Sequence, residues 1–456
     1  MKKITSLLLT VSVMLSFTAC SEKDNKTDTS IVPEKTSEKP VVTIGTVGEL
    51  SLFPAEYEFN LSQSKYRIQI KDYSKMVEDD DAECSKAFGL LKLDIISGNA
   101  PDIISVWPTP MSELIRTGMF EDMYSLMDEY GGISREDFLP NILEGFEIDG
   151  KIPAISPNFS INTAIAKTKY VGENSENWSL DKLIEIYDSL PEDMGLIENE
   201  YTDRSTVYEY VSKNFSYDCT DTKYYTCNFN NTDFKNSLDF ASSFPEKADY
   251  RTSDESQSFD TNIYHQGNNT LFLNDHILIH TFEIRCFGHS LGMDLLKFGG
   301  QPVTYVGYPS SDGNGAFTTC GDMYAISKSS ENKEYAWDVI SYLINDDNFQ
   351  TKMNNRFAGL PVLKKHLNRY IVDNSNEVND YLSIYSEYDN GLYITDELVK
   401  QIYEYICNVN FDPYWNYKIQ NIIDEECMSV IAGERSADEC ADILQSRISI
   451  YMSELN

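Results

Sequence analysis

The 456-residue sequence predicts an α/β protein with two lobes. Residues 102–107 are a short apolar run containing Ile103, Ile104 and Val106, which is typical of a strand buried on both faces of a parallel sheet. Helical patterns lie on either side of this run. Strand and helix patterns also alternate near both ends of the chain, and helices dominate its last part.

The chain is expected to begin its fold with two strands and a helix. Val41–Thr46 is a β-branched run, and Tyr66–Ile70 alternates between apolar and polar residues. Residues 88–95 carry apolar side chains at helical spacing, so we expect a helix that Gly98 can end.

The segment after the buried run is the first candidate for a site. Trp107 ends the run, and ligands of such sheets bind beyond the carboxyl ends of the strands, although Trp107 could equally be a core aromatic. Pro108 and Pro110 are expected to turn the chain into a loop. Ser112 is expected to cap a second helix, which Gly118 ends.

The middle of the chain is less regular. Gly150–Ile155 contains Pro153 and suits an extended crossing between lobes. Ser179 is placed to cap a helix through Tyr187. Residues 192–260 show weak periodicity, so only small helices and loops are expected there.

Short strands and two clear helices complete the expected elements. The strands are Leu271–Leu273, Val303–Val306 and Met323–Ile326. A helix is predicted over Tyr335–Ile344 from its apolar stripe, which places Trp337 beside the core. Ser436 and Glu439 form a capping box at the start of the last helix.

The net charge of −36 limits the possible partners. A surface this acidic repels phosphate backbones, so nucleic acid is excluded as a partner. It also repels anionic lipid, so contact with a membrane requires a dedicated anchor.

Such an anchor is predicted at the N-terminus. Basic residues precede the apolar run Ile4–Phe17, and residues 1–20 read as a signal peptide. Residues 18–20, ending in Cys20, resemble the bacterial lipobox, in which the cysteine is lipidated. Phe17 departs from the usual leucine, so cleavage without lipidation is the alternative. Residues 21–40 lack aromatics and read as a flexible linker.

Eight cysteines remain after Cys20, and an even number in an exported chain permits disulfides. Cys219 and Cys227 are the pair that proximity in sequence favours. The alternative is that all eight are small core residues. The chain contains no CxxC pair, so a cysteine zinc site has little support.

Two patterns resemble catalytic or metal sites. Residues 288–292, GHSLG, match the G-x-S-x-G elbow of serine hydrolases around Ser290. Only His366 follows as a possible triad histidine, and the preceding residues are poor for a buried strand. His276 and His280 could share a metal if they lay on a helix, but the run around them reads partly as a strand. Hydrogen-bonded histidines are the favoured interpretation, and no metal is expected.

Other signals concern the ligand class. There is no GxxxxGKS/T or GxGxxG motif, so no nucleotide or other cofactor is expected. The 73 acidic residues make paired-carboxylate arguments uninformative. Aromatic residues make up 12% of the chain, and aromatic faces in a cleft suit polyhydroxyl ligands.

An ordered series of motifs resembles the extracellular solute-binding proteins, family 1, of ABC importers. The series consists of EFNLSQSKYRIQIKDYS (58–74), SGNAPDII (97–104), FEIDGKIPAISPNFSINT (146–163), ENWSLDKL (176–183), VTYVGYPSSDGNG (303–315), MYAISKSSENKEYAWDVISYLI (323–344), RFAGLPV (356–362) and the C-terminal helix. Each motif alone is weak, whereas their order over nearly the whole chain is specific.

The resemblance implies a two-lobed periplasmic-binding-protein-like fold of type II, with hinge strands crossing between lobes. It implies lobe 1 over 41–156 and 320–352, and lobe 2 over 157–319 and 353–456. It also implies a helix over residues 282–292, which counts against the hydrolase elbow.

By position, the resemblance carries the family's ligand-binding residues onto eight positions. They are Glu49, Trp107, Asn158, Phe159, Phe282, Arg285, Asp322 and Tyr324. Aromatic rings would supply affinity, and Glu49, Arg285 and Asp322 would fix the orientation of the ligand. For Arg285 and Asp322, a solvated surface or a structural ion pair is the alternative.

The leading hypothesis is a non-enzymatic, monomeric substrate-binding lipoprotein, held on the extracellular side of the membrane through Cys20. It would capture a carbohydrate, implied to be an oligosaccharide, and deliver it to a membrane permease. Lobe closure would bury the ligand. The alternative hypotheses are a secreted serine hydrolase using Ser290 and a metal-binding protein using His276 and His280.

Overall fold

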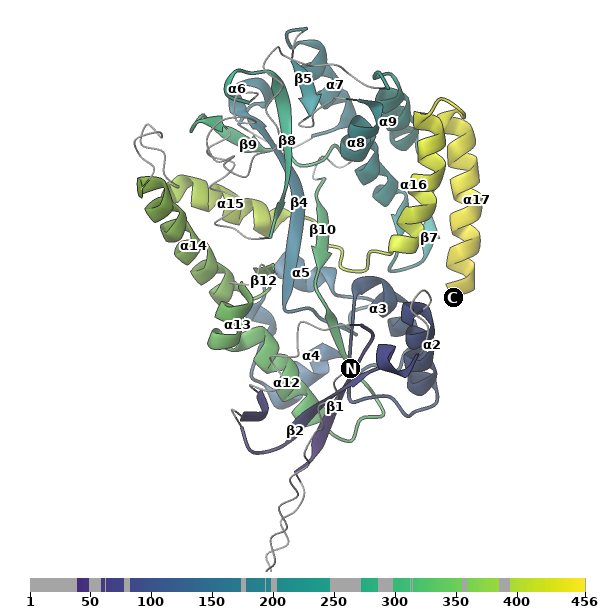
Figure 1. Cartoon of the computed structure of the whole chain (residues 1–456), viewed down its shortest axis with the longest axis vertical. Coiled ribbons are helices and arrows are strands. Elements are labelled where there is room, and N and C mark those ends of the chain that lie inside the picture. The colour runs from purple at the N-terminus through teal and green to yellow at the C-terminus, as the bar shows by residue number, and fades with distance from the viewer. Residues whose placement is uncertain are drawn as a thin grey trace, which may run out of the picture. The chain divides into compact units, whose positions relative to one another are not determined.

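The structure is a computed structural model, shown in Figure 1. It describes residues 39–48, 59–61, 63–77, 83–173, 178–192, 194–197, 203–246, 272–285, 298–311, 313, 315–354, 359–384 and 394–455.

The first sheet contains four strands in the order β11-β3-β1-β2. They are β11 (Met323–Ile326), β3 (Ile103–Val106), β1 (Val41–Thr46) and β2 (Arg67–Asp72). β1 is parallel to β2 and β3, and β11 is antiparallel to β3. All four residues of β3 are buried, which confirms the predicted two-sided burial of this strand.

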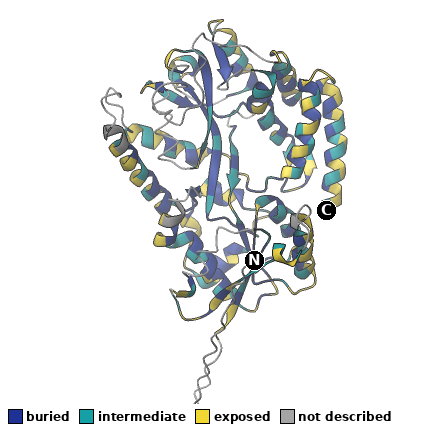
Figure 2. Ribbon diagram, viewed as in Figure 1, coloured by how far each residue is buried: buried dark blue, intermediate teal, exposed yellow. Residues whose placement is uncertain are grey.

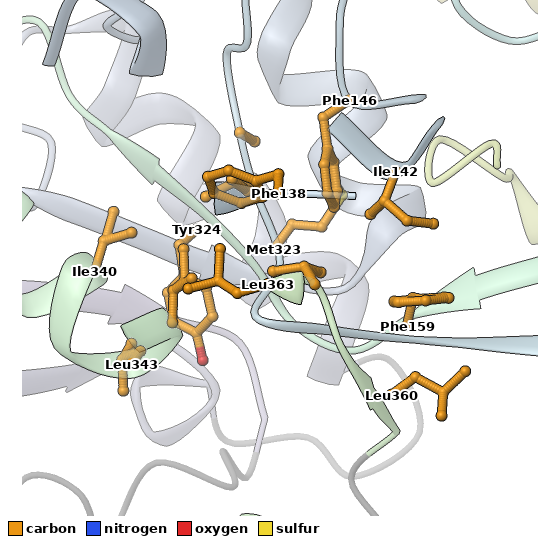
Figure 3. Packing of buried hydrophobic residues seen from close by; sticks show 14 of the residues in the cluster. Phe138, Ile142, Phe146, Phe159, Met323, Tyr324, Ile340, Leu343, Leu360 and Leu363 are labelled. Atoms are coloured by element: carbon orange, nitrogen blue, oxygen red, sulfur yellow. The ribbon is translucent and has the colours of Figure 1, made fainter. Parts of the chain in front are cut away.

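Short helices surround the first sheet. They are α2 (Glu83–Ile96), α3 (Pro108–Leu114), α4 (Met123–Tyr130), α5 (Pro140–Gly145), α12 (Lys333–Asn345) and α13 (Asp347–Asn354). Their apolar side chains form the first core cluster together with the sheet, and Figure 3 shows Phe138, Phe146 and Met323 within it. Trp337 is buried there, as its helical position predicts, and its indole donates to the carbonyl of Gly131 at 2.8 Å.

The second sheet is built around β4 (Asn158–Lys167), most of whose residues are buried (Figure 2). Its order is β10-β4-β8-β5, with β9 and β12 also pairing with β4. These partners are β10 (Phe317–Cys320), β8 (Ile277–Ile284), β5 (Gly195–Ile197), β9 (Val303–Tyr305) and β12 (Leu360–Pro361).

A second core cluster packs against this sheet. It is formed mainly by α7 (Leu180–Asp188), α8 (Arg204–Asp218), α9 (Thr232–Ser242), α16 (Tyr417–Ile431) and α17 (Ala437–Leu455). The hairpin β6 (Thr220–Asp221) and β7 (Thr226–Cys227) follows α8, and the short α6 (Thr168–Val171) follows β4. By contrast, α14 (Lys364–Ile384) and α15 (Asp396–Asn408) contribute to the first cluster.

Two neighbouring segments of the chain cross from one sheet to the other. Only Gly321 and Asp322 separate β10 of the second sheet from β11 of the first. Ile155 forms a bridge with Tyr324 just before β4 begins. A Cβ atom on Gly321 would lie 2.7 Å from the side-chain oxygen of Asn158, so a larger residue at 321 would require that side chain to move.

The segment after β3 differs from its prediction. Pro108 begins α3 and Pro110 lies in its first turn, where the missing N–H groups would have no partner within the helix. Ser112 is therefore inside α3 rather than its cap, and its hydroxyl donates to the carbonyl of Thr109 at 2.7 Å. Gly118, with φ of 64°, ends the following 3-10 turn as expected.

Three further predictions, for residues between 192 and 292, were wrong. Phe272 and Leu273 are helical rather than extended, and the strand begins later, at Ile277. Residues 282–284, predicted as helix by resemblance, form the end of β8. The irregular span 192–260 contains α8, of 15 residues, and α9, of 11 residues, among its described residues.

The predicted helix caps are confirmed. The hydroxyl of Ser179 accepts a hydrogen bond from the backbone N–H of Lys182. Ser179 thereby caps α7, which begins at Leu180. The backbone N–H of Ser436 donates to the carboxylate of Glu439, whose own N–H donates to the Ser436 hydroxyl. Within the described ranges, no helix is both long and apolar enough to cross a membrane.

Candidate functional site

A cavity of about 590 Å³ lies between the second sheet and α8. We call it the α8 cavity. Its lining residues are Asn162, Ile197, Ser205, Thr206, Glu209, Tyr210, Lys213, Asn214, Tyr217, Thr281, Tyr308, Phe317 and Met428. Asn162 comes from β4 and Thr281 from β8, so the sheet supplies polar groups to one side while α8 supplies the other.

A second cavity of about 240 Å³ continues from the first and shares Asn214, Tyr217 and Phe317 with it. We call it the Trp415 cavity, because Trp415 and Asp412 line its other side. Since the two cavities have three residues in common, they form one elongated site along α8.

Three aromatic rings meet where the cavities join. The rings of Tyr217 and Phe317 stack with centroids 4.7 Å apart, and Trp415 packs edge-on to Phe317 at 5.8 Å. The indole N–H of Trp415 donates to the hydroxyl of Tyr217 at 2.8 Å, which fixes both side chains. This aromatic triad is half-buried, so part of each ring remains accessible to a ligand.

The polar groups around the triad include an ion pair, a tyrosine hydroxyl and a carboxyl group. Glu209 and Lys213 form an ion pair of 2.8 Å along α8. Burial raises the pKa of Tyr308 to about 12, so its hydroxyl stays neutral and can donate. Loss of hydration also raises the pKa of Asp412, although its carboxyl group is accessible from the cavity.

The sheet residues toward the crossings carry a hydrogen-bonded polar row. The Ser160 hydroxyl lies 2.6 Å from the carboxylate of Glu283 and 2.7 Å from the hydroxyl of Thr319. Ser160 and Asn162 are two residues apart on β4 and therefore share one face of the sheet. The polar row thus extends the polar side of the α8 cavity toward the crossings.

Helix α3 of the first core cluster contacts this region directly. The Thr109 hydroxyl donates to the carbonyl of Trp415 at 3.1 Å. Lys418 pairs with the nearly buried carboxylate of Glu113 at 2.9 Å. In the 3-10 turn that follows α3, the guanidinium of Arg116 lies 3.3 Å from the ring centre of Tyr225, in the β6–β7 hairpin. We call these contacts the α3 latch.

Trp107, the predicted aromatic at the end of β3, is 69% exposed. It directly precedes α3 and lies two residues before Thr109, which holds the backbone of Trp415. The alternative interpretation of Trp107 as a core aromatic is therefore wrong.

Phe159 and Tyr324 lie in the hydrophobic interior near the crossings. Their exposed fractions are 1% and 3%, and Figure 3 shows both among the side chains of the first core cluster. Phe159 packs edge-on against Phe411 at 5.7 Å. The structure thus gives both rings a packing role, and ligand contact by them stays a prediction.

Four other predicted residues are partly or fully accessible. Asn158 and Asp322 lie at the crossings, Phe282 is half-buried in β8, and Arg285 is exposed. The guanidinium of Arg285 pairs with the carboxylate of Glu283 at 3.2 Å. This is the structural ion pair predicted from the sequence as the alternative role of Arg285. The side-chain amide oxygen of Asn158 is buried and has no hydrogen-bond partner among the described residues.

Glu49, Cys20 and Ser290 lie outside the described residues. The structure therefore does not describe the G-x-S-x-G motif around Ser290, and no finding favours a serine hydrolase. His276 and His280 cannot share a metal as helical neighbours, because His280 lies in β8 and residues four apart in a strand are about 13 Å apart. Among the residues that the structure describes, no cluster could hold a metal ion.

The predicted Cys219–Cys227 disulfide is absent, because both cysteines are free. Both cysteines pack against the second core cluster, and the sulfur of Cys227 also contacts the hydroxyl of Ser449 at 3.3 Å. Proximity in sequence was therefore not sufficient for a disulfide, although Cys227 pairs with Thr220, the neighbour of Cys219, in the β6–β7 hairpin.

The aromatic triad was missed by sequence reasoning. Its members come from α8, β10 and the segment before α16, so about a hundred residues separate each from the next. No local periodicity connects them. The only available signal was the general richness in aromatic residues.

Comparisons with known proteins agree with this geometry. The sequence profile described as bacterial extracellular solute-binding protein matches residues 80–368, which is more than half of the chain. No functionally curated protein was found to match the sequence.

Several solved structures share the fold. The sugar-binding protein MalE from Xanthomonas citri is 15% identical, and the match covers 91% of this chain and 98% of that chain with a TM-score of 0.56. The cyclic α-maltosyl-1,6-maltose binding protein from Arthrobacter globiformis is 16% identical, with coverage of 91% and 100% and a TM-score of 0.51. A de novo designed esterase is 13% identical, with coverage of 91% and 99% and a TM-score of 0.53.

At such identities the likeness establishes the fold and not the activity. The fold is that of two-lobed α/β binding proteins, in which crossing segments connect the lobes. With the profile match over most of its length, the chain belongs to the bacterial extracellular solute-binding protein family.

Proposed function

We propose that this protein is the substrate-binding component of an ABC importer, which captures a carbohydrate and delivers it to a membrane permease. The observation that carries the proposal is the aromatic triad of Tyr217, Phe317 and Trp415 at the junction of two connected cavities.

The chemistry of the site suits an oligosaccharide. Sugar rings present apolar C–H faces that pack on aromatic rings, while their hydroxyls need donors and acceptors in the plane of the ring. Asn162, Asn214 and Tyr308 supply such groups around the triad. The larger cavity, of about 590 Å³, is within the range of small-molecule sites, and its elongation suits more than one sugar unit.

The comparisons support a carbohydrate ligand by analogy. The names of two structural relatives refer to a sugar and to a cyclic maltosyl-maltose as their ligands. We propose an α-linked glucose oligosaccharide as the first ligand to test.

The binding residues predicted by resemblance remain part of the proposal. Trp107 would close one end of the site from α3, and Asn158, Phe282, Arg285, Asp322 and Glu49 would line the approach to it. Phe159 and Tyr324 would contribute indirectly, by packing in the core below the site and stabilising the crossing segments. No covalent step is proposed, because binding and release suffice for import.

The two lobes are proposed as residues 41–156 with 320–352, and 157–319 with 353–456. Their separate sheets support this division. Because α14 and α15 pack with the first core cluster, the last segment would bridge both lobes. Ligand binding would favour the closed arrangement, in which the α3 latch forms.

Attachment to the membrane is proposed through Cys20. Residues 1–20 would act as a lipoprotein signal peptide, and residues 21–40 would form the linker that holds a monomer outside the cell near its permease. Metabolic labelling with a radioactive fatty acid tests this: Cys20→Ser should abolish the label.

Thermal unfolding tests the ligand class. Maltotriose should raise the melting temperature in a concentration-dependent way, since a ligand that binds only the folded state stabilises it. Cellotriose and an amino-acid mixture serve as controls for linkage and class. A folded protein whose melting temperature no glycan changes would contradict a carbohydrate ligand.

A further inference from the structure

The last two helices bring two buried cysteines together. Cys427 lies four residues before the end of α16 at Ile431, and Cys440 lies three residues after the start of α17 at Ala437. Each cysteine is therefore about one turn from the segment that joins the helices, which pack side by side (Figure 1). Both side chains are fully buried and carry free thiols in this structure, with their sulfur atoms 4.0 Å apart.

We propose that Cys427 and Cys440 form a disulfide in the exported protein, which links α16 to α17. The proposal rests on the exported location given in the proposed function, and it is independent of the ligand. To form the bond, the two sulfurs need to approach from 4.0 Å to about 2.05 Å.

The reaction is a thiol–disulfide exchange with an oxidised dithiol. One cysteine thiolate attacks a sulfur of the oxidant, so a mixed disulfide forms and the first oxidant thiol leaves. The second cysteine thiolate then attacks the mixed disulfide, which forms the Cys427–Cys440 bond and releases the second oxidant thiol. The two protons lost by the cysteines end on the two reduced oxidant sulfurs.

Burial determines when this exchange occurs. Burial in the core raises the pKa of the Cys427 thiol well above its usual range, so the folded protein holds little thiolate there. Oxidation is therefore expected during folding after export, before α16 and α17 close over the sulfurs. The same burial would protect the finished disulfide from reductants.

The consequence would be a covalently fixed helix pair behind the ligand site. α16 begins two residues after Trp415, and its second residue, Lys418, makes the ion pair with Glu113 in the α3 latch. A disulfide near the far end of α16 would hold that helix in place while its first turn takes part in closure.

Mass spectrometry of tryptic peptides tests the proposal directly. Cleavage after Lys418, Arg435 and Arg447 places the two cysteines in separate peptides, 419–435 and 436–447, each with a single cysteine. In full chain exported to an oxidising compartment, or refolded with oxidised and reduced glutathione, the peptides should appear as one cross-linked species. Full alkylation of both peptides in both samples, before any reduction, would overturn the proposal.

Matched variants provide a second readout. Dithiothreitol should lower the urea midpoint of the oxidised wild-type protein and of Cys219→Ala/Cys227→Ala, and should leave that of Cys427→Ala/Cys440→Ala unchanged. An equal effect of dithiothreitol on the last variant would contradict the assignment. Because these measurements contain no glycan, failure of carbohydrate binding leaves them unaffected, and the refolding arm makes them independent of export.

Discussion

Trp415 is the residue on which the proposed ligand contact depends most. It contributes one ring of the aromatic triad and holds a second through its hydrogen bond to Tyr217. Trp415→Ala should raise the Kd for the oligosaccharide at least about tenfold, since a stacked ring contributes on the order of 1.5 kcal/mol. Isothermal titration calorimetry measures this.

The control for Trp415 is Tyr224→Ala, which removes an exposed ring outside both cavity linings. Its Kd should equal that of the wild type. If Trp415→Ala stays folded and binds as tightly as Tyr224→Ala, the triad is not the ligand site.

Gly321 shows how the crossings constrain single residues. Its Cβ would lie 2.7 Å from the side-chain oxygen of Asn158, which would have to leave its preferred rotamer, so Gly321→Val should reduce the free energy of unfolding by roughly 1 kcal/mol. Urea denaturation checks this value. Gly89→Ala is the matched control, because Gly89 has open space around it within α2, and there alanine should stabilise by up to about 1 kcal/mol.

At the scale of elements, the α3 latch connects the first core cluster to α16. Lys418→Met leaves the nearly buried Glu113 without its ion-pair partner, so the closed form should lose stability and the ligand Kd should rise about 5- to 20-fold. Lys418→Met/Glu113→Gln should recover part of this loss, because no buried charge is left unpaired. Identical Kd values for Lys418→Met and the wild type would show that closure does not use this pair.

The α16–α17 pair also carries an expected pH effect. Burial tends to raise the pKa of Glu426, but the guanidinium groups of Arg447 and Arg435 outweigh it and lower the pKa below the usual value. A carboxyl group with a lowered folded pKa stabilises the protein above its unfolded pKa and loses that contribution as the pH falls through the folded pKa.

Glu426→Gln should therefore destabilise the protein at pH 7, and the difference from the wild type should shrink as the pH falls below about 4.5. Urea midpoints measured between pH 7 and pH 3 test this. Glu425→Gln is the control, since Glu425 is exposed and its ion-pair partner among the described residues is Arg447. A difference that is constant over this pH range would contradict the assignment.

Sequence reasoning succeeded for elements that are buried on one face only or at every position. The buried strand β3, the stripe of α12 and the caps of α7 and α17 each follow from local pattern. It failed for α8, because this helix lies among the second sheet, α9 and α16 and buries serine and asparagine as well as tyrosine. A helix surrounded in this way shows no amphipathic stripe to detect.

At the scale of the whole molecule, the site depends on contacts that no short stretch specifies. The position of Trp107 after β3 was predictable because it follows a recognisable strand, and its contact with a ligand stays a prediction. The triad was not, since tertiary packing brings together rings from α8, β10 and the segment before α16. The order of motifs along the chain predicted the two-lobed fold, which the profile match and the structural relatives confirm.

The measurement that tests the central proposal most directly is a crystal structure of the protein with the oligosaccharide that stabilises it most. We predict sugar rings within the joined α8 and Trp415 cavities, stacked on Tyr217, Phe317 or Trp415, with the α3 latch closed. An oligosaccharide bound elsewhere on the protein, with these rings free of ligand, would contradict it.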